Sequence, residues 1–156
     1  MLEHSAGGAL GLVINNPSQT TIKRFSDSQD ILCHSNLWNL PVYAGGPVET
    51  NRGWILHEDV DVPERREILP NLFLSGSADS LKYLLESGRQ PLRLILGYAG
   101  WGAGQLEQEM AAGSWLTSPV RVEHILHTEA SIAWKAVIND LGIDPTQLAV
   151  IGSGVH

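Results

Sequence analysis

The sequence has almost no cysteine: Cys33 is the only one among 156 residues. A single thiol can build neither an intrachain disulfide framework nor a zinc site made of thiolates. A chain of this kind suits a reducing compartment. We therefore expect a cytoplasmic protein.

Cationic residues are also scarce. Lysine and arginine together number 10 against 17 acidic residues, which gives a net charge of -7 and a pI of about 5.2. Non-specific affinity for nucleic acid comes mainly from cations that displace the counterions of phosphate. Only Lys23-Arg24 and Arg65-Arg66 are adjacent basic pairs. Direct nucleic-acid binding is therefore not expected.

Long apolar runs are missing as well. No stretch approaches the ~18 apolar residues of a membrane span, and the first residues, MLEHSAGG, do not resemble a secretory signal. Hydrophobic residues make up 43% of the chain and charged residues 17%, as in globular proteins. No repeat or linker divides the chain, so we predict one domain over residues 1–156.

Apolar runs and turn signals predict an α+β fold. Because several strands of the N-terminal half follow one another without helices between them, antiparallel pairing or a curled sheet is favoured over a doubly wound one. Helix-capping signals are clearest at Ser77 and Gly88. The expected strands cover 9–15, 40–47, 53–57, 71–76, 92–96, 123–126 and 147–151, and the expected helices cover 28–34, 77–88, 105–112 and 129–141.

The most unusual stretch is Pro91–Trp115, PLRLILGYAGWGAGQLEQEMAAGSW. It predicts a buried strand, a glycine-rich turn and a short helix, which is the arrangement of many anion sites. However, Gln105 stands where a dinucleotide fingerprint needs its last glycine, and Glu107 and Glu109 would repel phosphate. Three interpretations remain open: a close-packed structural junction, which is favoured, a non-phosphate pocket in which Tyr98, Trp101 and Gln105 bind a ligand, and a phosphate site, which these features disfavour.

Other candidate chemistry is sparse. His124 and His127 would point to opposite faces of a strand, so we expect no metal site there. No cofactor is expected. His57 lies at the end of a predicted strand and can be a general base, a ligand or a hydrogen-bonded structural residue. Ser75-Gly76-Ser77 lacks the pattern of a nucleophile elbow and is typical of a helix cap.

Five segments resemble the YqgE/AlgH family and occur in the order found there. They are GALGLVINNP at 8–17, VYAGGPV at 42–48, RGWILH at 52–57, GYAGWGAGQLEQE at 97–109 and LGIDP at 141–145. The resemblance implies a bifurcated, mostly antiparallel sheet curled into a pseudo-barrel with three to four flanking helices. It implies no established reaction, although one branch is named as a putative transcriptional regulator of alginate synthesis.

The sequence differs from the family pattern at three places. Family members usually carry a further N-terminal segment with a strand, so we expect an unpaired sheet edge that oligomerisation would cover. Asn16 replaces a cation in the family's Asn-Arg/Lys-Pro turn, and Leu2 stands where a cysteine sometimes occurs. Thiol chemistry at that position is therefore not implied.

Three functions stay open at this point. The first is a non-catalytic module that binds a protein or small-molecule ligand and regulates indirectly. The second is a small enzyme or small-molecule binder with a groove at the glycine motifs, and the third is a direct DNA-binding regulator. The hypothetical ligand-binding groove contains eight residues: Gly45, Gly46, His57, Tyr98, Trp101, Gly102, Gly104 and Gln105.

Overall fold

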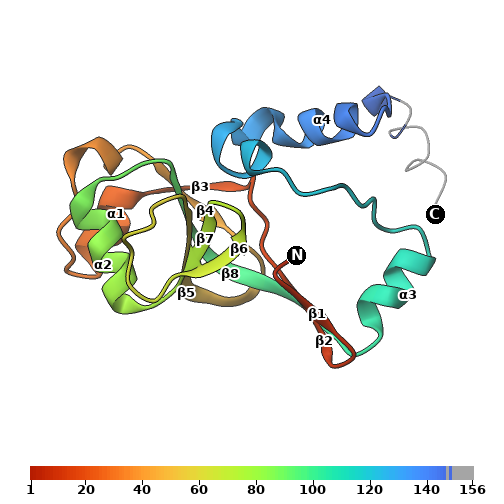
Figure 1. Cartoon of the computed structure of the whole chain (residues 1–156), viewed down its shortest axis with the longest axis horizontal. Helices are drawn as coiled ribbons and strands as arrows, with labels where there is room; N and C mark the ends of the chain where they lie inside the picture. Colours follow the sequence, from red (N-terminus) through yellow and green to blue (C-terminus); the bar gives the residue numbers. More distant parts are fainter. Residues whose placement is uncertain (147, 149–156) are drawn as a thin grey trace.

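The computed structural model describes residues 1–146 and 148, and it folds them into a curled sheet with short helices (Figure 1). The elements in chain order are β1 (Glu3–Ser5), β2 (Gly8–Gly11), β3 (Pro17–Thr21), α1 (Ile22–Ser28), η1 (Ser35–Leu37), β4 (Pro41–Ala44), β5 (Val48–His57), β6 (Arg66–Leu69), β7 (Leu72–Ser75), α2 (Ala78–Ser87), β8 (Leu92–Gly102), α3 (Gln105–Ala111), η2 (Glu123–His127) and α4 (Ala130–Asp140).

Strand β8 is the centre of the sheet, whose main path runs β1-β2-β8-β5-β7-β6. One edge of β8 pairs with β5. The other edge pairs first with β4, where Tyr43 faces Ile95 in parallel, and then with β2, where Ala9 faces Trp101 antiparallel. The sheet therefore divides into two branches along β8. The predicted α+β fold with a bifurcated, mostly antiparallel sheet is confirmed.

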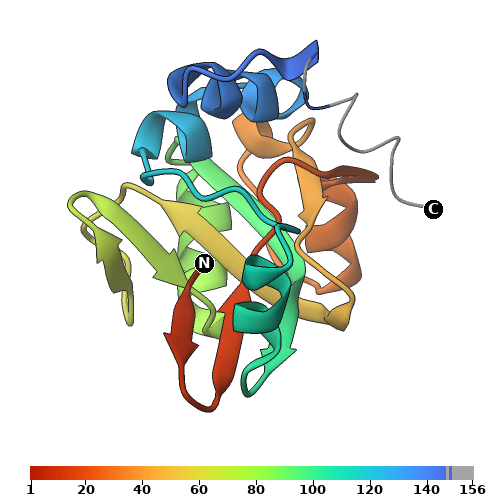
Figure 2. The same cartoon turned by 90° about the vertical axis from the view of Figure 1, so that its right-hand side faces the viewer.

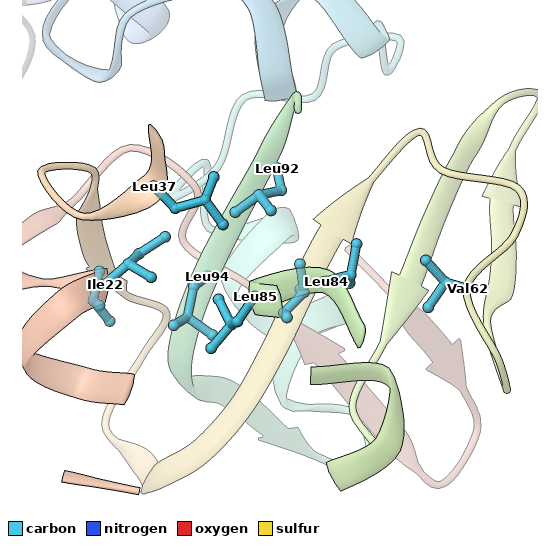
Figure 3. Close-up of a cluster of buried hydrophobic side chains, with 9 residues drawn as sticks. Ile22, Leu37, Val62, Leu84, Leu85, Leu92 and Leu94 are labelled. Carbon is cyan, nitrogen blue, oxygen red and sulfur yellow. The ribbon is translucent and has the colours of Figure 1, made fainter. Parts of the chain in front are cut away.

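Helices α1 and α2 cover one face of this sheet, and we call it the helix-covered face (Figure 2). Alternate residues of β5 and β8, such as Ile55 and Leu94, point into it. Figure 3 shows Leu94 near Leu85 of α2 and Ile22 of α1, and Ile55 belongs to the same cluster of buried side chains. Leu84, Leu85 and Leu94 have no exposed surface, so this face carries a closed hydrophobic core.

The opposite face, which we call the open face, is covered mainly by irregular chain. Its core consists of Leu56, Leu74 and Ile95. Leu12 and Ile14 pack on this core from the N-terminal side, as do residues of η2. An extended segment passes in front of this face between α3 and η2, on the side of the molecule away from α1 and α2 (Figures 1 and 2).

Local sequence signals explain the best-predicted helix. Ser77 caps α2 by accepting a hydrogen bond from the Ser80 backbone, Asp79 lies in the first turn, and Gly88 ends the helix with left-handed backbone angles. The predicted helix at 129–141 is likewise present as α4. Among the described residues, no helix is both long and apolar enough to cross a membrane.

Several sequence predictions were wrong. Gly97 to Gly102 is not a turn, because β8 continues through it to Gly102. The helix expected at 28–34 lies earlier, as α1, where Thr21 caps its first turn. Residues 123–126 form part of the π-helix η2 and not a strand. Strands β1, β3 and β6 were not predicted, and the strand expected at 147–151 lies outside the described residues except for residue 148.

Candidate functional site

The two glycine motifs meet where the sheet divides, at a place we call the fork: Gly45, Gly46, Gly97 and Tyr98. The Gly45 backbone N–H donates to the Leu96 carbonyl at 2.7 Å, and the Gly45 carbonyl accepts from Val13 at 2.9 Å. A Cβ at Gly46 would overlap the backbone of Tyr98, and Gly46 and Gly97 both have positive φ angles, 152° and 76°. Backbone approaches backbone here, which only glycine permits.

Beyond the fork, the end of β8 and helix α3 are joined by a carboxylate. Glu109 accepts hydrogen bonds from the indole N–H groups of Trp101, at 3.0 Å, and Trp115, at 2.8 Å. The side-chain NH₂ group of Gln105 donates to the other carboxylate oxygen of Glu109 at 3.0 Å. The side-chain carbonyl of Gln105 accepts a hydrogen bond from the Gly102 backbone N–H. We call this set of four side chains the Glu109 clamp. The donors, Trp115 first, hold the pKa of Glu109 below its ordinary value.

The segment that follows the clamp, residues 114–121, has no regular structure, and we call it the strap. Trp115, Leu116 and Val120 expose 48%, 55% and 57% of their surface. Within the described part of the chain, the backbone groups of residues 115–120 make no backbone hydrogen bond. Within the described residues, the strap therefore presents apolar side chains together with backbone groups that no other backbone group pairs, although the Ser118 hydroxyl donates to the Pro119 carbonyl.

Both ends of the strap are fastened to the body. At its start, the Ser114 backbone N–H donates to the Glu109 carbonyl at 3.0 Å, in addition to the clamp. At its end, Arg121 and His124 both contact Asp140 of α4, at 3.1 and 3.3 Å. The middle of the strap is thus held in position without being covered.

Between the strap and the open face lies a pocket of about 150 Å³, which we call the apolar pocket. Every side chain that lines it is apolar. Val120 belongs to the strap, and the other lining residues come from the N-terminal segment, β5 to β7 and η2: Met1, Leu2, Leu12, Ile14, Leu56, Ile68, Leu69, Leu72 and Ile125. Val120 is thus common to the strap and the pocket.

His57 lies elsewhere, under the helix-covered face. Its side chain is 1% exposed, stacks on Phe73, and lies 2.9 Å from the hydroxyl of Ser75, which is itself 2% exposed. Burial lowers the pKa of His57 below its ordinary value, so the imidazole is neutral at pH 7. His57 and Ser75 thus form a hydrogen bond within the core.

The structure separates the eight predicted site residues into groups. Gly45 and Gly46 lie in the fork, and Trp101, Gly102, Gly104 and Gln105 lie around the Glu109 clamp or at the start of α3. Tyr98 packs edge-on against Trp54, on the side of β8 opposite to Trp101. His57 is buried on the helix-covered face. Among the described residues, the eight predicted site residues therefore do not line one groove.

The histidine pair also differs from expectation, because both residues are in η2 and not on a strand. His124 contacts Asp140, whereas His127 lies 2.7 Å from Glu58. Within residues 1–146 and 148, no cluster of three or more potential ligands that could hold a metal ion is formed.

Comparison with known proteins supports the resemblance found in the sequence. A family model described as AlgH-like matches residues 1–146. The chain belongs to the AlgH-like family. The UPF0301 protein of Myxococcus xanthus is 43% identical over 156 residues, which cover all of this chain and 86% of that relative. The UPF0301 protein of Paracoccus denitrificans is 40% identical and is covered over 80% of its length.

Solved structures agree with the AlgH-like fold. The solution structure of the AlgH protein from Pseudomonas aeruginosa matches with a TM-score of 0.74 and 33% identity, over 99% of this chain and 82% of that one. A crystal structure of a Corynebacterium diphtheriae protein matches with a TM-score of 0.67 over 88% of this chain and 73% of that one. At 19% identity it shows the fold alone.

Sequence reasoning missed two parts of this AlgH-like chain. It treated Glu109 only as an obstacle to phosphate, although the spacing of Gln105 and Glu109 on one helix face predicts their contact. It also passed over Trp115-Leu116 and Val120. The signal there was the pair Trp115-Leu116 and Val120 in a segment without helical or strand periodicity, WLTSPV, between two predicted helices.

Proposed function

We propose that this AlgH-like protein is a non-catalytic binding module that takes up an extended apolar segment of a partner protein alongside the strap, and that its regulatory role is indirect. The observation that carries the proposal is the strap itself. It combines exposed Trp115, Leu116 and Val120 with backbone groups that form no backbone hydrogen bond in the described part of the chain. A strand added alongside would cover the apolar side chains and also pair with these backbone groups.

The charge around the strap indicates what flanks that segment. Between Gln105 and Asp140 there are five carboxylates, on Glu107, Glu109, Glu123, Glu129 and Asp140, and two cationic side chains, which gives this segment a net charge of -3. Asp140 already contacts Arg121 and His124, and Glu107 contacts His4, so the net charge of the segment and not each single carboxylate favours a cationic partner. Apolar contacts give affinity, while complementary charge speeds encounter and fixes orientation. A segment with an apolar centre and lysine or arginine near its ends fits this surface best.

The alternative of a direct DNA-binding regulator has little electrostatic support. Six of the ten lysine and arginine residues are in ion pairs with carboxylates: Lys23, Arg52, Arg66, Lys82, Arg89 and Arg121. A seventh, Arg93, is 5% exposed and donates to the carbonyls of Ile14 and Thr128. Few cations therefore remain to contact phosphates, and we expect no gel shift with duplex DNA even at low salt.

A peptide-binding experiment tests the proposal. The probe is a labelled ten-residue peptide in which leucine and threonine alternate and each end carries a lysine. We expect saturable binding by fluorescence anisotropy. A peptide with proline at the threonine positions is the control, since proline cannot donate to a neighbouring strand, and it should not bind.

Variants locate the binding. The double variant Leu116→Ser/Val120→Ser should lose about tenfold or more in affinity, because exposed contacts of this size contribute roughly 1 kcal/mol each. The matched control is Leu32→Ser/Val60→Ser, which removes exposed apolar side chains, 77% and 54% exposed, away from the strap. Equal affinity for both double variants would refute the proposal.

A second copy of this chain is the competing occupant, and sedimentation at several concentrations detects it. The proposal predicts that self-association, if present, is the same in the Leu116→Ser/Val120→Ser variant. A dimer that this double variant dissociates would show that the strap faces a second copy, and the proposal of a different partner would fail.

A further inference from the structure

We infer that the apolar pocket is an anchor site that accepts one phenyl-sized side chain of the segment bound along the strap. This inference rests on the proposed function and specifies what the segment must contain. Val120 connects the two features, because it is part of the strap and also lines the pocket. A side chain of the bound segment that faces the sheet next to Val120 enters the pocket.

The size of the pocket selects the occupant. Its volume is about 150 Å³. An engineered cavity of about that size, lined by leucine, isoleucine and phenylalanine, stays dry and binds benzene. A phenyl group therefore fills the pocket, an isobutyl group fills part of it, and an indole is too large.

The side chains of the lining favour apolar occupants. Leu56 and Leu72 are 2% and 0% exposed, and the lining side chains are all apolar, with backbone groups supplying the polar part of the pocket surface. A charged or amide side chain would lose water contacts that the apolar lining side chains do not replace. The preferred residue at the anchor position is phenylalanine, followed by leucine, with alanine and aspartate far below.

A peptide series tests the order. The parent is the lysine-flanked peptide of alternating leucine and threonine, with a central leucine replaced in turn by phenylalanine, alanine, tryptophan or aspartate. We expect the phenylalanine peptide to bind roughly thirtyfold more tightly than the alanine peptide, as full burial of such a side chain implies. The tryptophan and aspartate peptides should bind more weakly than the phenylalanine peptide.

A change in the pocket should change the preference. Ile68 lies on the edge strand β6 and lines the pocket, so Ile68→Ala enlarges it. We expect the variant to prefer tryptophan over phenylalanine, which loss of stability alone would not produce. Ile132→Ala is the matched control: Ile132 is 51% exposed on α4 and does not line the pocket, so the preference should stay at phenylalanine.

A titration with benzene tests the apolar pocket without any peptide. Titration with benzene should shift the methyl NMR signals of Leu12, Ile68 and Leu72 and leave those of Leu84 and Leu85 unchanged. If all peptides bind with one affinity, the anchor inference is wrong and the proposed function stands. If no peptide binds, both are wrong, and a benzene response then shows an apolar pocket that serves no bound segment.

Discussion

The two faces of the sheet bury apolar residues by different means. On the helix-covered face, α1 and α2 bring Ile22, Leu84 and Leu85 onto β5 and β8 and leave no part of the leucines exposed. On the open face, the sheet is covered by irregular chain, and the strap leaves Leu116 and Val120 more than half exposed. One face is therefore a closed core, whereas the other leaves apolar side chains on the surface, where the proposed partner segment would bind.

The largest expected effect comes from the helix-covered face. Leu84→Ala should lower the free energy of unfolding by about 3 kcal/mol, since it leaves a cavity where Leu84 has no exposed surface. Leu116→Ala on the strap should change it by no more than about 0.5 kcal/mol. Urea unfolding of both variants measures the contrast, and similar losses would show that the strap is part of the core.

The fork should respond nearly as strongly as the core. At Gly46 a Cβ would overlap the backbone of Tyr98, and the φ angle is already 152°. Gly46→Ala should therefore cost roughly 2 to 3 kcal/mol in stability. Gly104→Ala is the comparison, because nothing lies within 4 Å of its Cβ position and only the positive φ of 75° opposes the change. It should cost about 1 kcal/mol.

A smaller effect concerns the pH dependence of stability. His57 is neutral in the folded protein because burial lowers its pKa below the ordinary value of 6.5. Below about pH 6.5 the unfolded chain takes up this proton first, so the free energy of unfolding falls as the pH is lowered. His57→Gln should flatten the slope between pH 6.5 and 5 by up to about 1.4 kcal/mol per pH unit. An unchanged slope would contradict a buried, neutral His57.

The smallest effect on stability is expected at the Glu109 clamp, which is exposed. Glu109→Leu removes the acceptor, so it should free the Trp115 indole, shift its fluorescence to longer wavelength and speed exchange of its N–H proton. Because three donors depress the pKa of Glu109, the wild-type indole signals should stay constant down to the ordinary glutamate value of 4.5 and change only below it. A change already at pH 5 to 6 would rule out the clamp as described.

The sequence predicted the parts of this comparison that depend on local chemistry. Ser77 and Gly88 set the ends of α2, and the periodic apolar residues of α4 predicted that helix. The glycines of β8 were misinterpreted as a turn. At Gly97 the reason is the close approach of the Gly45 and Gly46 backbone, more than forty residues away, which no local pattern contains.

The candidate site was harder to predict than the fold. Trp101 and Gln105 do come together, but through Glu109 and with Trp115, which the sequence reasoning did not include. His57 looked like a functional group because it follows an apolar strand and precedes two acids. The pairing of β5 with β7 buries it instead against Phe73 and Ser75. Exposure and strand pairing, which decide both cases, are properties of the assembled sheet.

Amide hydrogen exchange along the strap tests the central claim most directly. With saturating lysine-flanked peptide of alternating leucine and threonine, added strand pairing should slow exchange at alternate amides of residues 115–120, since the N–H groups of an edge strand point alternately toward and away from the added strand. The amides of α2 should be unchanged. Slowed exchange with period two along the strap is the predicted result, and strap amides that exchange equally fast with and without bound peptide would contradict the account.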